Sequence, residues 1–346
     1  GGQVNLGPAV TAGLIGGEVC ARLVAAGHRV TALVHRNPEV RGNDGARVPV
    51  VETVACDIRQ ERLGLDEGTF ARLARETDLI VHCAATTRFD LTDEGYAAVN
   101  TRGTANVLAL AEAGGAGLLQ VSTAYVCGKR DGEIREDDPL PTAGFANGCE
   151  KSKAAAERLV RASDVEWAIA RPAITLGESA TGRIRQFDAI YLAFKLIAEG
   201  RIRLVPAGTN ATLNFVPLDH VAGGIVALAR NWEKARGGTY HLVSSDPLPM
   251  VDFAKGIGSV EGLHEPKLVD PVAFDPASLP PLERRLHGRV SALYASYFQR
   301  DPRFDDSHFR AVTGLASHPA DSAYLRRLID FCVSEGFLPT ASVLAK

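Results

Sequence analysis

Gly13-Leu14-Ile15-Gly16-Gly17-Glu18 is a glycine-rich turn that leads directly into a helical pattern over residues 17–26. Such a turn presents free backbone N–H groups and the positive end of a helix dipole, and both favour a bound pyrophosphate. The usual first glycine would stand three residues before Gly13, where this sequence has Val10, so the loop is either irregular and turned by Gly7 or built differently. We expect the phosphates of a dinucleotide to bind at Gly13, Leu14, Ile15 and Gly16. A helix start without a ligand is the alternative.

Short β-branched runs alternate with longer helical patterns over the first 170 residues. This alternation is typical of βαβ units and a parallel sheet. The sequence predicts an α/β fold, a Rossmann-type doubly wound parallel sheet with a first strand ahead of Gly13 and at least six strands in all. The predicted helices span 17–26, 69–76, 94–113 and 150–162, and the other predicted strands span 28–34, 49–55, 79–83, 118–122 and 167–170.

An aromatic pattern follows this alternating part of the chain. Phe187, Tyr191 and Phe194 recur at i, i+4 and i+7 and predict one face of a helix that covers the site. After Asp246 the chain is proline-rich, and we expect it to be irregular apart from a late helix over 322–332. Both regions are expected to form a smaller C-terminal cap that binds substrate.

Two segments between these regions carry patterns of the first domain. Residues 213–229 and a strand over 239–243 are expected to return to it. These assignments define two expected domains. We expect an NADP-binding Rossmann domain of residues 1–176 and 212–245, and a substrate-binding cap of residues 177–211 and 246–346.

Composition excludes several classes of partner. The 346 residues carry a net charge of -3, which leaves no overall positive field for a polyanion, so no nucleic-acid partner is expected. Six cysteines are scattered without a C-x-x-C pair, a usage that favours reduced thiols in a cytoplasmic protein. The sequence holds no long apolar stretch and no metal-ligand spacing, so neither a membrane nor a metal is expected. The number of subunits is left open.

Arg36 favours NADPH over NADH. It stands about twenty residues past Gly16, at the end of the second strand, where NAD-specific folds place an acid for the ribose 2′-hydroxyl. A guanidinium suits a 2′-phosphate because it can form a bidentate contact, and a solvated arginine is the alternative. Asp57, with Ile58 after it, can accept a hydrogen bond from the adenine amino group. Cys83-Ala84-Ala85 ends the fourth strand in small residues, against which the cofactor can lie.

Five motifs, taken in order, resemble the extended short-chain dehydrogenase/reductases. They are Val81-His82-Cys83-Ala84-Ala85, Val99-Asn100-Thr101-Arg102-Gly103-Thr104, Val121-Ser122-Thr123-Ala124-Tyr125-Val126, Arg171-Pro172-Ala173 and Asn214-Phe215-Val216-Pro217-Leu218-Asp219. The resemblance covers residues 1 to 245, and the motifs together are far more specific than any one of them. It implies that Arg171, Pro172 and Ala173 lie beside the nicotinamide, with simple termination of the sixth strand as the alternative.

The active site that this resemblance implies consists of an Asn, a Ser or Thr, and a Tyr-x-x-x-Lys pair. By position these are Asn100, Thr123 with Ser122 beside it, and Lys153, whereas the tyrosine position holds Cys149. In the family the tyrosine phenol protonates the carbonyl oxygen while hydride arrives. The lysine lowers the pKa of that phenol and holds the nicotinamide ribose. The alternative, non-catalytic interpretation of Asn100 is a residue at a helix kink that binds a water molecule.

Cys149 cannot simply replace that phenol. Its sulfur falls about 3–4 Å short of a tyrosine oxygen, which is too far for a hydrogen bond, and Lys153 would favour a thiolate that cannot donate. Three interpretations follow: Tyr125 donates from the same strand end as Thr123, the substrate's own adjacent phenol donates, or reduction is lost and the protein senses NADPH. We favour the substrate's phenol, because an internal donor has a very high effective concentration. Cys149 as a small filler or a nucleophile remains open.

The sequence also resembles atypical ketoreductases of aromatic polyketide tailoring that lack the family tyrosine. That resemblance implies reduction of an angucyclinone ketone by NADPH. Residues 82–89 followed by 122–125 also resemble fatty acyl-CoA reductases, so thioester reduction is a rival, as are an NADPH-responsive regulator and a sugar-nucleotide epimerase. Aromatic faces suit a flat polycycle. The candidate pocket walls are Phe89, Phe145, Phe187, Tyr191, Phe194, Tyr294, Tyr297 and Phe298.

Overall fold

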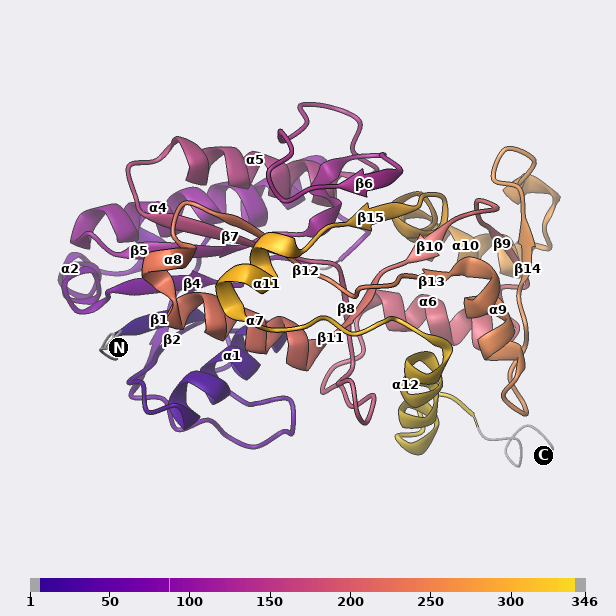
Figure 1. Ribbon diagram of the computed structural model, residues 1–346, viewed down its shortest axis with the longest axis horizontal. Helices are drawn as coiled ribbons and strands as arrows, with labels where there is room; N and C mark the ends of the chain where they lie inside the picture. The colour runs from indigo at the N-terminus through magenta and orange to yellow at the C-terminus, as the bar shows by residue number, and fades with distance from the viewer. Residues whose placement is uncertain (1–6, 87, 340–346) are drawn as a thin grey trace.

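A seven-stranded parallel sheet forms the centre of the protein, as the computed structural model of residues 7–86 and 88–339 shows (Figure 1). Its strands are β1 (Pro8–Thr11), β2 (Thr31–Val34), β3 (Glu52–Ala55), β4 (Leu79–His82), β5 (Gly117–Val121), β7 (Trp167–Pro172) and β12 (Thr239–Leu242). They lie in the order β12-β7-β5-β4-β1-β2-β3, so the strand order reverses at β1 and β4. This order confirms the predicted α/β, doubly wound Rossmann-type fold.

Helices cover both faces of this sheet (Figure 1). One face carries α2 (Glu67–Glu76), α4 (Gly103–Gly114) and α5 (Gly148–Ala162), and the other carries α1 (Leu14–Ala25) and α7 (Leu218–Arg230), which continues into the short α8 (Trp232–Ala235). Because both faces are covered, every residue of β4 and β5 is buried, as their nearly continuous apolar sequences require. Among the helices of the described residues, none is long and apolar enough to span a bilayer.

The predicted helix over 94–113 contains a wider turn. α3 (Asp93–Tyr96) begins after Thr92, whose side chain accepts a hydrogen bond from the Gly95 N–H at 3.1 Å. A π-helical turn over Ala97–Arg102 follows and continues directly into α4. Such turns are rare and occur frequently at functional sites. This one carries Asn100.

A smaller cap lies beyond the carboxyl ends of the strands, on the right of Figure 1. It contains a parallel pair of strands, β9 (Leu204–Pro206) with β14 (Lys267–Val269), and an antiparallel pair, β10 (Thr212–Leu213) with β13 (Leu248–Pro249). Another parallel pair, β8 (Ile174–Leu176) with β11 (Phe215–Pro217), connects the sheet to the cap. The cap elements are α6 (Ala189–Ala198), β9 (Leu204–Pro206), β10 (Thr212–Leu213), β13 (Leu248–Pro249), α9 (Met250–Gly258), β14 (Lys267–Val269), α10 (Pro281–Leu293) and α12 (Ser322–Ser334).

The chain after Asp246 is more regular than its prolines predict. α9 begins directly after Pro249, and α10 has Pro281 as its first residue. Proline fits the first helical position, where its missing N–H would have no partner in the helix. The prolines therefore mark where helices begin, and the expectation of an irregular region was wrong.

Residues 302–313 lie against the Rossmann body, although we expected them in the cap. β15 (Pro302–Phe304) pairs with β6 (Gly132–Ile134), and α11 (Ser307–Thr313) packs against α7 and β12. Glu136 fixes this return, because its carboxylate accepts backbone N–H groups from His241, His308 and Phe309 at 3.0, 2.7 and 3.1 Å. These contacts join residues that are far apart in the sequence, so no local sequence pattern predicts them.

Candidate active site

The phosphate loop lies between β1 and α1 and turns at Gly13. Gly13 has φ 153°, and no side chain caps the helix that starts after it, so the first N–H groups of α1 remain available. A Cβ on Gly13 would meet nothing within 4 Å, whereas a Cβ on Gly16 would lie 2.1 Å from the Thr11 carbonyl oxygen. Gly16 therefore allows α1 to approach β1 closely. The loop has the shape and the free donors that a pyrophosphate requires.

Val10, at the place of the usual first glycine, belongs to β1, and the turn comes after it at Gly13. Val10 is fully buried in β1, opposite Val81 of β4. Thr11 ties β1 to the end of β4, since its Oγ1 accepts the N–H groups of Cys83 and Ala84 at 2.7 and 2.8 Å. Gly7 precedes β1 and donates its N–H to Asp78, so Gly7 does not make the turn.

A cleft of about 340 Å³, here called the main cleft, lies at the carboxyl ends of β1, β4, β5 and β7. This is where ligands bind in open α/β sheets. Lys153 enters it from α5, one helical turn after Cys149. The predicted site residues that the main cleft brings together are Gly13, Leu14, Ile15, Gly16, Cys83, Ala84, Ala85, Thr123, Cys149, Lys153, Pro172 and Ala173.

A second cavity of about 270 Å³ continues from the main cleft at Ala12, Ala84 and Ala85. Its walls include Asp57 and Ile58, as predicted for an adenine site. Hydrogen bonds from Arg59, at 3.0 and 2.9 Å, lower the pKa of the Asp57 carboxyl to about 2, with a smaller contribution from the charge of His35. Asp57 is therefore an ionised acceptor at the end of a continuous cleft that fits a dinucleotide.

Arg36 is exposed and follows His35, which lines this second cavity, and the described residues give Arg36 no ion pair. We expect Arg36→Ala to weaken NADPH binding by about 1.5–3 kcal/mol, the scale of a hydrogen bond to a charged group. NADH binding should change little, because NADH lacks the 2′-phosphate. Fluorescence titration of both nucleotides measures this difference. Equal losses for the two would remove Arg36 from the 2′-phosphate site.

Asn100 does not line the main cleft; it holds two of its walls together. Its Oδ1 accepts the Thr86 N–H at 3.2 Å, and its Nδ2 donates to Ser152 Oγ at 2.9 Å. The Ser152 hydroxyl in turn donates to the Cys149 carbonyl at 2.8 Å. The buried amide therefore fixes the segment after β4 against the start of α5, and its two bonds are to protein groups.

Arg171 is the predicted cofactor residue that the structure places elsewhere. It is 3% exposed and forms a bidentate pair with Glu157, at 3.0 and 2.7 Å. The Ser122 hydroxyl donates to the same carboxylate at 2.7 Å. Its donors are directed at Glu157 and it lines neither cavity, so the prediction that Arg171 contacts the nicotinamide was wrong. Of the neighbours Ser122 and Thr123, which both line the main cleft, only Thr123 has a hydroxyl that is not directed at Glu157.

Tyr125 is buried behind the main cleft. We expected it to project from the same strand end as Thr123, but Thr123 Oγ1 accepts the Tyr125 N–H at 3.3 Å and starts a 3-10 turn. The alternation of an extended strand therefore stops before Tyr125. Its ring is 2% exposed, packs edge-on against Tyr297 and Phe304, and lies under the guanidinium of Arg300. The expectation that it reaches the substrate was wrong.

Cys149 occupies the tyrosine position at the first turn of α5. Its Sγ lies 3.8 Å from the Thr86 carbonyl oxygen, to which the thiol donates a weak hydrogen bond. No histidine lines the described part of the main cleft, so the histidine that would activate a cysteine nucleophile is not seen there. The side chain fills space at the wall of the cleft.

The sequence analysis did not identify three polar residues that line the main cleft, of which Thr175 comes from β8. Gln186 and Asp188 come from the segment before α6. Asp188 accepts the Ile190 N–H at 3.2 Å as the cap of α6, and burial raises the pKa of its carboxyl to about 6. An aspartate before an apolar helix is a usual capping signal. The sequence around Asp188, however, does not indicate that this helix start faces the main cleft.

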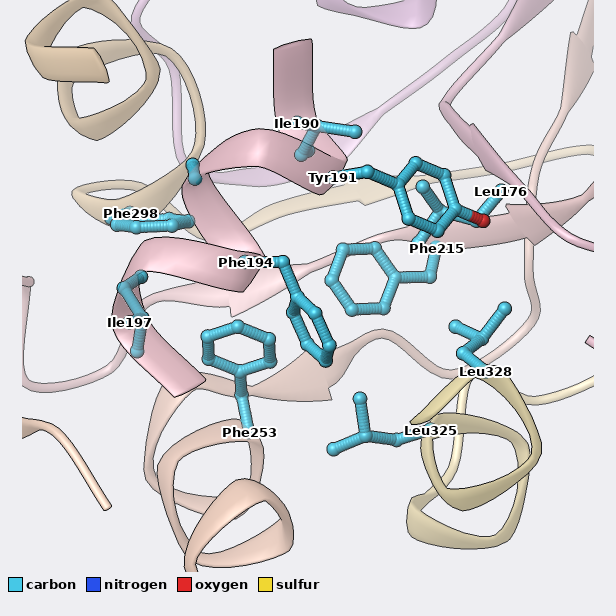
Figure 2. Close-up of a pocket in the computed structure, with 11 residues that line it drawn as sticks. Leu176, Ile190, Tyr191, Phe194, Ile197, Phe215, Phe253, Phe298, Leu325 and Leu328 are labelled. Atoms are coloured by element: carbon cyan, nitrogen blue, oxygen red, sulfur yellow. The ribbon is translucent and has the colours of Figure 1, made fainter. Parts of the chain in front are cut away.

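The aromatic candidates separate into three groups. Phe89 and Tyr297 line the main cleft. Figure 2 shows Tyr191, Phe194 and Phe298 around a small apolar cavity between α6, α9 and α12, which shares Ile190 with the main cleft. Its free volume is only about 20 Å³, so these side chains form packed core. The remaining candidates line neither cavity and are Phe145, Phe187, which stacks on Phe337, and Tyr294.

Reductases are among the known proteins that are similar in sequence to this chain. Aldehyde reductase lnaA of Aspergillus flavus is 29% identical over 224 residues, which cover 59% of this chain and 21% of that protein. The 3-diazoavenalumate denitrifying reductase of a Streptomyces species is 27% identical, with 77% of this chain and 84% of that protein covered. The chain spans 15% of an isonitrile lipopeptide synthase of Streptomyces coeruleorubidus, so several relatives are much longer proteins.

A solved structure is similar over almost the whole chain. The terminal R domain of the myxalamid PKS-NRPS pathway matches with a TM-score of 0.84 and 25% identity, covering 97% of this chain and 93% of that domain. Residues 25–225 match the NAD-binding family described as male sterility protein, and this match covers more than half of the chain. The protein therefore belongs to the NAD-binding male sterility protein family, with the fold of the extended short-chain dehydrogenase/reductases.

Proposed function

We propose that the protein is an NADPH-dependent ketoreductase that acts on a ketone of a polycyclic aromatic, angucyclinone-type polyketide in antibiotic biosynthesis. Membership of a reductase family supports the oxidoreductase class. One observation carries the finer proposal: the main cleft keeps the phosphate loop, Thr123 and Lys153 but has Cys149 where the family has its acid. Such a site can still bind a reduced nicotinamide, and it needs a substrate that brings its own proton.

The two connected cavities fit NADPH. The N–H groups after Gly13 would face the pyrophosphate, Asp57 the adenine, Arg36 the 2′-phosphate and Lys153 the nicotinamide ribose. When bound, NADPH supplies a hydride for the carbonyl carbon. Thr123 Oγ1 accepts only the Tyr125 N–H among the described contacts, so its own proton is free to bond to the ketone oxygen.

The proton for the ketone oxygen does not come from Cys149, Ser122 or Tyr125. The Cys149 thiol donates to Thr86, the Ser122 hydroxyl donates to Glu157, and Tyr125 is buried. In the proposed reaction the carbonyl carbon accepts hydride with its electron pair, and the carbonyl π electrons move to oxygen. That oxygen takes the proton of the adjacent phenol, and the resulting phenolate later takes a proton from water.

The test is NADPH oxidation by the protein with a panel of hydroxy-aryl ketones and quinones, with acyl thioesters alongside. We expect turnover of polycyclic ketones that carry a phenol next to the carbonyl. Cofactor binding without turnover of any panel member would instead favour an NADPH-responsive regulator. Turnover of thioesters alone would overturn the proposal.

Thioester reduction is the second candidate, because of the likeness to the myxalamid R domain and to lnaA. That likeness extends over 97% of this chain for the R domain. Cys149 counts against it, since a simple thioester has no neighbouring phenol and would still need an acid from the protein. The thioester arm of the panel separates the two candidates.

A further inference from the structure

Tyr297 brings a phenol into the main cleft from the cap. It lies in a π-helical turn, Tyr294–Phe298, which continues α10, and it lines the main cleft together with Cys149 and Phe89. Its ring packs edge-on against Phe89 at 6.2 Å and against Tyr125 at 4.8 Å between centroids. No other tyrosine lines the described part of this cleft. Among the described contacts, no protein group bonds to its hydroxyl.

Two polar contacts fix Tyr297 beside Cys149. Asn147 donates from its side chain to the Ser296 hydroxyl, and Arg300 pairs with Glu150 at 2.7 Å. Asn147 and Glu150 stand on either side of Cys149 in the chain, while Ser296 and Arg300 stand on either side of Tyr297. The pair of Arg300 and Glu150 is buried. The segment that carries Tyr297 is therefore fastened to the helix start that lacks the family tyrosine.

The proposed reaction leaves a negative charge that needs a partner. As the substrate's phenol gives up its proton, charge develops on the phenolic oxygen inside the main cleft. A donor that meets this charge stabilises the transition state more than the ground state, because the charge is absent before reaction. Lys153 is assigned to the ribose and Thr123 to the ketone oxygen, so neither serves this second oxygen.

We propose that the Tyr297 hydroxyl donates a hydrogen bond to the phenolic oxygen of the bound substrate and stabilises the phenolate that forms during reduction. This role rests on the proposed function, because it requires a ketone with a neighbouring phenol. Tyr297 transfers no proton in this step. The proton moves within the substrate, and the tyrosine stays protonated throughout.

The surroundings of Tyr297 suit a donor that keeps its proton. Burial raises the pKa of its phenol well above the usual value, and the nearby groups Tyr125, Glu150 and Cys149 raise it further. The positive charge of Arg300 acts in the opposite direction, but Arg300 is paired with Glu150. In the family the acidic tyrosine has a lysine that lowers its pKa. Tyr297 has the reverse environment, which favours hydrogen bonding over proton transfer.

Tyr297→Phe removes the hydroxyl and keeps the ring. For a hydroxy-aryl ketone, we expect kcat to fall about 10- to 150-fold, the range for a lost hydrogen bond to a charged group. KM and the NADPH dissociation constant should stay nearly unchanged, because the bond strengthens only as charge develops. In a substrate series of varied phenol acidity, kcat of the variant should depend more steeply on acidity. A purely structural role would lower kcat equally across the series.

Tyr294→Phe is the matched control. It makes the same change three residues earlier in the same π-helical turn, where the hydroxyl bonds to His287 Nδ1 at 2.7 Å and lies outside the main cleft. We expect wild-type kcat and an unchanged dependence on phenol acidity. If Tyr297→Phe behaves like this control, or lowers kcat without changing the dependence, the proposal is wrong.

A binding measurement keeps this test independent of turnover. The absorbance of a bound hydroxy-aryl ketone reports its phenolate, and the pKa of the bound phenol should be lower in the wild-type protein than in Tyr297→Phe. Equal values, or no binding of such ketones, would overturn the role of Tyr297. Reduction of an O-methylated ketone by the wild-type protein at an undiminished rate would instead disprove the proton route of the proposed function, and with it this inference.

Discussion

Methylation of the phenol beside the ketone is expected to lower the rate of reduction by about 10²- to 10⁴-fold, the contribution of a positioned general acid. The reason is that the family's acid is absent and that the Cys149 thiol is directed at the Thr86 carbonyl. Cys149→Ala should therefore keep most of the activity toward the free phenol. Stopped-flow measurement of NADPH oxidation in a single turnover separates this chemical step from product release.

The comparison of the methylated ketone with the free phenol needs a control for binding. The methylated ketone should still bind, which competition against the free phenol in steady-state assays would show. If Cys149→Ala loses activity while the methylated ketone is reduced normally, Cys149 takes part in proton transfer and the substrate does not supply the proton.

Arg171→Met is expected to destabilise the protein by about 3–5 kcal/mol, because it leaves the Glu157 carboxylate buried without its main partner. Urea unfolding measures this loss. Replacing Arg171 and Glu157 together by apolar residues of similar size should recover much of the stability, since no unpaired charge remains. If Arg171 instead bound the cofactor, the single variant would weaken NADPH binding with little loss of stability.

Acid should weaken the same pair. Burial raises the pKa of Glu157, but the charge and hydrogen bonds of Arg171, with the Ser122 hydroxyl, lower it more, so the net shift is downward from 4.5. Glu157 therefore stabilises the folded protein above the pKa of the unfolded chain, and this contribution is lost as pH falls through the lower folded-state value. The double apolar variant should lack this part of the acid sensitivity.

Local signals explain why the phosphate loop could be predicted. A glycine turn, a helix start and the small residues after β4 are short-range features, and the structure brings them together in one cleft. Tyr125 shows the limit of such reasoning, because one hydrogen bond from its N–H to Thr123 changes the chain from strand to turn. The alternation of an extended strand therefore does not predict the direction of Tyr125, which lies within the 3-10 turn.

Tertiary contacts explain what the sequence could not show. Arg171 and Glu157 come from β7 and α5, and either residue alone is a plausible surface charge. Tyr297 is held near Cys149 by contacts of Ser296 with Asn147 and of Arg300 with Glu150, which lie 149 and 150 residues apart in the sequence. It was one of eight aromatic candidates, and the sequence held no reason to separate it from the others.

The return of residues 302–313 to the Rossmann body affects how a substrate can enter. The chain passes between body and cap several times, because the cap helices α6, α9, α10 and α12 alternate along the chain with α7, β12, β15 and α11 of the body. β6 and Glu136 hold β15 and α11 against the body. Hinge closure normally bends a few residues in one or two connections. In this protein, all the connections between body and cap would have to bend together for the two parts to close. We therefore expect bulky polycycles to enter by local movement of side chains at the rim, while the two halves of the molecule keep a fixed angle.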